Sequence, residues 1–201
     1  IMPIETFPTD PNYRSINFQD NRPTLLNQTL SCKKSARQIG SQYFSFTVQM
    51  PPIQQEKAQE IFAFLQKQKG AIGNFKIQAP LDNLGASKNE TDILVNTAHS
   101  AGAETVNMDG FSATTGVLKA GDLIKFENHS KVYMVQENEN ASVGQSAVKI
   151  SPNLVSSLAD NEEVTVNKPS FTVYLENNDI MYSTDASGFY SISFDVREVI
   201  T

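Results

Sequence analysis

Between residues 92 and 176 the sequence consists of short runs in which apolar and polar residues alternate. A period of two residues is that of a strand with one buried face. Turn residues separate the runs, for example Asp109-Gly110, Ala120-Gly121-Asp122 and Asn128-His129. The runs span residues 105–108, 122–127, 131–137, 146–150, 163–166 and 171–176. Short strands that are closely spaced and joined by polar turns predict a small β-barrel or sandwich in this part of the chain.

Before residue 81 the pattern predicts two strands and one helix. Residues 42–50 alternate cleanly, with Phe44, Phe46 and Val48 on one side, and predict a half-buried strand. After Pro51-Pro52, the segment 53–69 has the 3.6-residue period of a helix that buries one stripe. Its apolar stripe comprises Ala58, Ile61, Phe62 and Leu65. Gly70 stands where a left-handed helix cap belongs, and residues 74–80 read as a short strand.

The remaining segments divide into strands and irregular parts. The first dozen residues carry three prolines and predict an extended arm, while residues 13–18 predict a strand through Tyr13, Ile16 and Phe18. Residues 19–42 are polar and irregular, and 81–91 read as a linker. Residues 188–200 form a long final strand whose pattern resembles the early strands.

These elements predict a mainly β fold of two domains. A β-sandwich-like domain with one packed α-helix, helix 53–69, comprises residues 1–91 plus 177–201, and the C-terminal strand completes it. A small β-barrel, residues 92–176, is inserted into this domain.

Charge and cysteine content exclude several classes of function. The chain has 201 residues and a net charge of −6, so it lacks the positive charge that attracts nucleic acid. The basic group Lys33, Lys34 and Arg37 reads as solvated surface. No apolar run is long enough to cross a bilayer, and no signal peptide is visible. The single cysteine, Cys32, has no partner for a disulfide or a zinc site, which favours assembly in the cytoplasm.

No arrangement of residues in the sequence predicts catalysis. The two histidines, His99 and His129, lie in turn-like stretches away from any nucleophile motif, and we expect both on the surface. The acidic groups 137–139 and 160–163 lack the spacing of a calcium loop. The carboxylates Asp179, Asp185 and Asp195 are the candidates for hydrolysing a glycosidic bond, but the chain has no tryptophan for a sugar cleft. We therefore predict no enzyme, no cofactor and no metal site.

Two stretches together resemble the distal tail and minor tail proteins of long-tailed bacteriophages. The first, residues 44–80, reads FSFTVQMPPIQQEKAQEIFAFLQKQKGAIGNFKIQAP, which is a strand, a helix ending near glycine and a strand ending in proline. The second, residues 100–166, contains AGDLIKF, KVYMV and GQSAVKISPNL followed by an acidic turn, as in a small β-barrel module of phage tail proteins. The two stretches cover about half of the chain.

The resemblance implies a structural virion protein at the tail tip. Such a subunit forms a ring, expected to be a homo-hexamer, as a baseplate hub or tail adaptor that joins the tail tube to the host-recognition apparatus. The implied partners are other copies of the chain, the tail tube protein and the tail-tip hub proteins, with no nucleic acid and no membrane insertion. The implied location is the virion, after assembly in the host cytoplasm.

The segments that have too few apolar residues for a core of their own are the ones we expect to reach a neighbouring subunit. The candidate interface residues are Tyr13, Ile16, Phe18 and Arg22. Two other hypotheses stay open at this point. One is a carbohydrate- or cell-surface-binding module of a phage tail, and the other is a glycan hydrolase.

Overall fold

A computed structural model describes residues 4–78, 81–184 and 188–200 of the chain, which divides into two compact units. The first unit consists mainly of Pro8–Asn74 and Val173–Glu198. The second consists mainly of Phe75–Thr172, with Ile4–Phe7. Each unit therefore combines segments that are far apart in the sequence.

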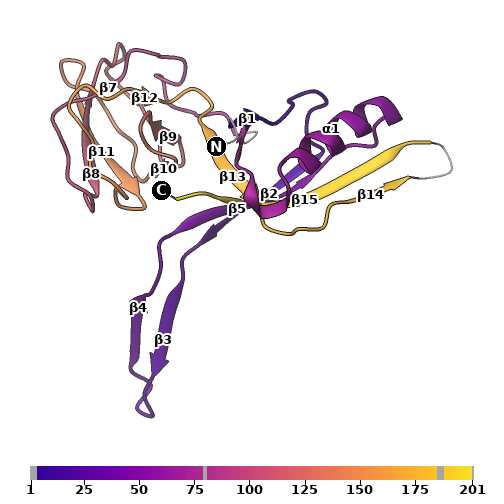
Figure 1. The fold of residues 1–201 in the computed structure, drawn as a ribbon. Helices are drawn as coiled ribbons and strands as arrows, with labels where there is room; N and C mark the ends of the chain where they lie inside the picture. The colour runs from indigo at the N-terminus through magenta and orange to yellow at the C-terminus, as the bar shows by residue number, and fades with distance from the viewer. Residues whose placement is uncertain (1–3, 79–80, 185–187, 201) are drawn as a thin grey trace. The chain divides into compact units, whose positions relative to one another are not determined.

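The first unit is built on an antiparallel sheet (Figure 1). Its strands are β2 (Ser15–Asn21), β5 (Tyr43–Gln49), β13 (Ser170–Leu175), β14 (Met181–Thr184) and β15 (Tyr190–Glu198). The strand order is β13-β15-β5-β2, and β14 also pairs with β15. The predicted alternation is confirmed, since Phe44, Phe46 and Val48 on β5 are buried, as are Ile192, Phe194 and Val196 on β15. The C-terminal strand thus pairs with an early strand, as the sequence predicts.

Helix α1 (Gln55–Lys67) belongs to the first unit and lies within the predicted segment. Ala58, Ile61 and Leu65 recur at helical spacing and are its buried residues. Lys69 and Gly70 follow with positive φ values of 55° and 69°, and Gly70 opens the short 3₁₀ helix η1 (Gly70–Ile72). Glycine is favoured at position 70 by its positive φ, and a Cβ there would also require the Asn178 side chain, whose Oδ1 would lie 2.6 Å away, to move.

Residues 19–42 are more regular than the sequence predicts. Strand β2 runs on to Asn21, and β3 (Thr24–Gln28) pairs with β4 (Lys34–Gln38) in an antiparallel hairpin. Every residue of β3 and β4 is exposed, so no face of the hairpin is buried and no two-residue apolar alternation marks it. The prediction of an irregular segment is therefore wrong for this hairpin.

The second unit begins with a parallel pair, β1 (Glu5–Thr6) and β6 (Phe75–Gln78). Phe7 follows β1, is buried, and lies with its ring 6.3 Å from that of Phe75. The prediction of an extended N-terminal arm is therefore wrong for residues 5–7, which pair with a strand because Phe7 has a core to enter.

A six-stranded, barrel-like sheet forms the main part of the second unit. Its strands are β7 (Leu94–Val95), β8 (Thr105–Asp109), β9 (Leu123–Phe126), β10 (Val132–Val135), β11 (Ser146–Ser151) and β12 (Val164–Thr165). They pair in the order β12-β9-β10-β11-β8-β7. The sheet nearly closes, because Val95 N–H donates to Glu162 O and Val164 N–H donates to Ile93 O, both at 2.9 Å. The predicted mainly β fold with one helix and a small barrel is confirmed.

The predicted linker at 81–91 is an integral part of the second unit. Asn83 is buried, and its side-chain amide donates to Leu123 O and Val166 O while its carbonyl oxygen accepts from Leu123 N–H. Asp122 is also buried and accepts from the backbone N–H groups of Leu84, Gly85 and Lys119. Polar side chains, rather than apolar ones, therefore attach this segment to the barrel.

None of the helices among the described residues has the length and apolar character that crossing a membrane requires.

Candidate functional site

Three of the four predicted interface residues lie on or just before β2, the last strand in the order of the first unit's sheet. Ile16 pairs with Val48 and Phe18 pairs with Phe46, and both side chains are half-buried. The Phe18 ring packs against those of Phe44 and Phe46, with centroids 4.7 and 5.0 Å apart. Among the described strands of this unit, only β5 pairs with β2, so its far edge is open to another strand.

Tyr13 precedes β2 and is half-buried. Burial raises the pKa of its hydroxyl to about 12, because desolvation disfavours the tyrosinate. Tyr13 is thus anchored in the first unit and presents only part of its ring to a partner.

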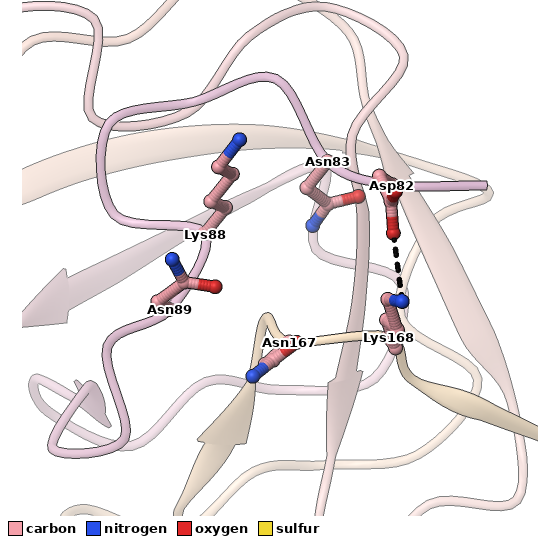
Figure 2. A pocket seen from close by; sticks show the side chains of 6 residues that line it. All are labelled: Asp82, Asn83, Lys88, Asn89, Asn167 and Lys168. Atoms are coloured by element: carbon pink, nitrogen blue, oxygen red, sulfur yellow. Dashed lines mark ion pairs between the residues drawn. The ribbon is translucent and has the colours of Figure 1, made fainter.

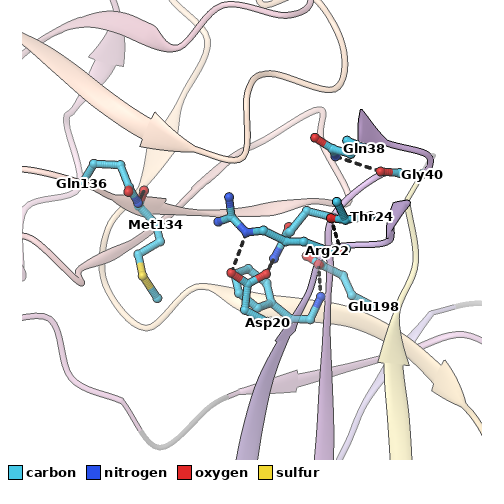
Figure 3. Close-up of polar contacts among 10 residues, drawn as sticks. Asp20, Arg22, Thr24, Gln38, Gly40, Met134, Gln136 and Glu198 are labelled. Carbon is cyan, nitrogen blue, oxygen red and sulfur yellow. Dashed lines mark hydrogen bonds and ion pairs between the residues drawn. The ribbon is translucent and has the colours of Figure 1, made fainter. Parts of the chain in front are cut away.

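Arg22 lies at the neck between β2 and the hairpin (Figure 3). It is exposed, and its Nε lies 2.9 Å from the Asp20 carboxylate, which also accepts from Gln42 Nε2 at 2.6 Å. Thr24 Oγ1 donates to Arg22 O at 2.9 Å, and Gln38 Nε2 donates to Gly40 O at 2.8 Å. These short contacts fix the conformation of the residues that join β2 and β5 to the hairpin.

The hairpin beyond this neck extends away from β2 and β5 (Figure 1). Its apolar side chains are unusually accessible, since Leu25 is 56%, Leu26 60% and Leu30 107% exposed. Leu25 pairs with Arg37 and Leu26 with Ala36, so the two leucines lie on opposite faces. Each face therefore offers an apolar group to a partner, and sequence reasoning missed the hairpin because adjacent leucines break the strand alternation.

The hairpin also concentrates positive charge. Residues 22–41 include Arg22, Lys33, Lys34 and Arg37 and no acidic residue, which gives this segment a net charge of +4. Since the whole chain carries −6, the remaining residues carry −10. The hairpin is therefore electrostatically complementary to the rest of the same chain.

The predicted histidines lie in the second unit, and one of them is not on the surface. His129 is buried, and its Nδ1 shares a 2.9 Å hydrogen bond with the Tyr133 hydroxyl, which accepts from Val155 N–H. His99 is half-buried, and its Nε2 accepts from Asn107 N–H at 3.0 Å. The prediction of surface histidines is wrong for His129, because its ring is buried and packs against Phe126 and Tyr133.

The acidic candidates have structural partners. Glu162, in the acidic group 160–163, is buried and accepts from the backbone N–H groups of Asn128 and Ala159. Asp195 accepts from Thr47 Oγ1 and Asn177 Nδ2. Asp179 is exposed, and Asp185 lies outside the described residues. No group of three or more potential metal ligands occurs among the residues that the structure describes.

A polar pocket of about 270 Å³ opens on the second unit (Figure 2). Its lining comprises Asp82, Asn83, Lys88, Asn89, Asn167 and Lys168. Lys168 Nζ and the Asp82 carboxylate form an ion pair at 3.2 Å across it. The pocket lacks aromatic and histidine side chains, so it offers neither a stacking surface nor a general base of the usual kind.

Comparison with known proteins finds two matches. Residues 87–169 match the family described as "Distal tail protein pb9, B domain". Distal tail protein pb9 of Escherichia phage T5 is 26% identical to the chain over 198 residues, which cover 94% of this chain and 96% of that protein. The resemblance to phage distal tail proteins is confirmed.

The matches to pb9 bear differently on the two units. The matched family segment covers the barrel strands from β7 to β12, whereas the similarity to the whole pb9 protein extends over 94% of the chain. The comparisons support a phage tail protein.

Proposed function

We propose that this chain is a ring-forming subunit of a phage tail tip. In this proposal, six copies join through protein–protein contacts as a baseplate hub or tail adaptor. The ring binds the tail tube protein on one side and tail-tip hub proteins on the other, within the virion. The similarity to distal tail protein pb9 supports a location of the ring at the end of the tail.

The exposed hairpin β3–β4 is the observation that carries the proposal. An isolated two-stranded hairpin is only marginally stable in water, and this one buries neither of its faces. A neighbouring subunit would cover Leu25, Leu26 and Leu30 and supply the missing packing. The open edge of β2, with Tyr13, Ile16, Phe18 and Arg22, continues the same surface and belongs to the proposed interface.

Charge supports contacts between copies of the same chain. The hairpin segment carries +4 and the rest of the chain −10, so a hairpin that docks on a second copy meets opposite charge. A contact between two different surfaces of identical subunits is heterologous, and such contacts close into rings when the rotation allows.

In this proposal the barrel of each subunit is a separate module that is not part of the ring contacts formed by the hairpin. We propose that residues 92–176 are inserted into a domain formed by 1–91 and 177–201. The discontinuous division of the chain supports an insertion, although the compact unit that contains the barrel spans Phe75–Thr172 and so includes the segment 81–91. The family match to residues 87–169 lies within that unit.

The proposal is tested by the mass and shape of the purified full-length protein. We expect native mass spectrometry to give a hexamer and electron microscopy to give rings at micromolar concentration. The double substitution Lys34→Glu/Arg37→Glu reverses the charge of β4, and we expect it to shift the protein to monomers. Cys32, exposed at the hairpin tip, provides a second measurement, because its reaction with a maleimide should slow when rings form.

A matched control changes the same amount of charge elsewhere. Lys88→Glu/Lys119→Glu alters two exposed lysines of the second unit and should leave the rings intact. A wild-type protein that stays monomeric at high concentration contradicts the proposal, and so do rings that both double variants form equally well.

A further inference from the structure

A small aromatic cavity in the first unit has no part in the proposed ring interface. It lies where α1 meets β14 and β15, and its volume is about 200 Å³. Its lining comprises Gln55, Ala58, Gln59, Phe62, Tyr182 and Tyr190. Four of these residues come from one helix and two from strands more than a hundred positions later, so the fold alone brings them together.

Three aromatic rings are part of the lining of this cavity. Phe62 and Tyr182 meet edge to face with centroids 4.8 Å apart, and Tyr182 and Tyr190 lie 5.9 Å apart. Tyr182 remains 51% exposed, so much of its surface faces the solvent rather than the core. Exposed aromatic surface held in place by neighbouring rings is a preformed stacking platform.

Polar groups without charge complete the lining. Gln55 and Gln59 are exposed and lie four residues apart on α1, hence on the same face as Phe62. Each amide offers both a donor and an acceptor, which suits hydroxyl groups. With no charged side chain in the lining, the cavity favours a neutral ligand.

We propose that this cavity binds one neutral pyranose ring of a glycan. The apolar C–H face of the sugar would stack on Tyr182, and its hydroxyls would bond to the amides of Gln55 and Gln59. The volume is below the roughly 300–1,000 Å³ typical of sites for drug-sized ligands, which fits a single ring rather than an oligosaccharide. The inference does not depend on ring formation. A subunit with this site would bind a glycan of the host surface directly.

Saturation-transfer difference NMR on the full-length protein tests the proposal. The probes are the methyl glycosides of glucose, galactose, mannose and the two common N-acetylhexosamines, with a proline-rich peptide as a competing ligand for an aromatic groove. We expect transfer to the ring protons of at least one glycoside. Tyr182→Ala should weaken its binding about tenfold through loss of stacking, and Gln59→Ala should weaken it less.

Met181→Ala is the matched control, because Met181 is the exposed neighbour of Tyr182 on β14 and is not part of the lining. It should bind as wild type does. Gln59 is exposed on the helix, so its replacement by alanine tests the site without disturbing the core. The proposal is overturned if no glycoside receives saturation, if binding survives Tyr182→Ala unchanged, or if only the peptide binds.

Discussion

The barrel and the hairpin β3–β4 differ in how far their apolar side chains are buried. The barrel encloses a continuous core, which includes Val106, Ile124, Phe126 and Val148, and it holds its own polar groups through Asn83 and Asp122. The hairpin β3–β4 has equally apolar leucines but leaves them in solvent. The barrel thus buries its apolar side chains within a single copy, and the exposure of the hairpin leucines supports the proposal that a partner covers them.

The largest effect should come from the barrel core. Phe126 is fully buried and packs on Tyr133 with ring centroids 5.4 Å apart. We expect Phe126→Ala to lower the free energy of unfolding of the second unit by about 3–5 kcal/mol, because a large cavity replaces the ring. Urea-induced unfolding followed by hydrogen exchange of barrel amides measures this loss. A loss below about 1 kcal/mol would mean that the barrel is not a packed core.

A slightly smaller effect should follow removal of the buried carboxylate. Asp122→Ala leaves the N–H groups of Leu84, Gly85 and Lys119 without their acceptor. We expect a destabilisation of about 3 kcal/mol by the same measurement, since the buried N–H of Gly85 and two partly buried N–H groups lose a charged acceptor. Asp179→Ala, at an exposed aspartate of the first unit, is the control and should change stability by less than about 0.5 kcal/mol.

Alkaline pH should weaken the first unit through Tyr13. The folded pKa of about 12 lies above the ordinary value of 10, so folding favours the protonated hydroxyl. This contribution is complete below pH 10 and is lost as the pH rises through about 12. We expect Tyr13→Phe to reduce the loss of stability between these pH values. Equal alkaline unfolding curves for the two proteins would show that Tyr13 is solvated.

The smallest effect on stability should come from the hairpin itself. Leu26→Ala removes an exposed side chain and should change the free energy of unfolding of the monomer by less than about 0.5 kcal/mol. The same substitution should raise the concentration at which copies associate, measured by light scattering. A variant that loses monomer stability but assembles normally would show that Leu26 is packed within the single copy, as the barrel core is.

Sequence patterns predicted the parts whose side chains alternate between core and solvent. Strand β5, helix α1 and the barrel strands β8 to β12 fall in this group, because burial of one face imposes a period that can be read directly. The pattern did not predict β3 and β4, where adjacent Leu25 and Leu26 face opposite sides and neither is buried. A segment that buries neither of its faces has no apolar period from which its strands could be predicted.

Other features depend on contacts between distant residues. In the sequence Asn83 reads as part of a linker, because its partners Leu123 and Val166 are far away along the chain. His129 reads as a surface residue in a turn, because its contact with Tyr133 is not visible in the sequence. The aromatic cavity joins Phe62 to Tyr182 across the fold. The alternation of Ile16 and Phe18 predicts their strand, β2, but the open edge of β2 follows only from the strand order.

Hydrogen exchange of the hairpin amides, residues 24–38, tests most directly whether this segment is completed by a partner. The full-length protein is compared as dilute monomer and as purified assembly, with the amides of β9 and β10 as an internal reference. We expect the hairpin amides to exchange rapidly in the monomer and to become protected at least about a hundredfold in the assembly, while the reference amides are protected in both. Strong protection in the monomer, or continued rapid exchange in the assembly, would contradict the account.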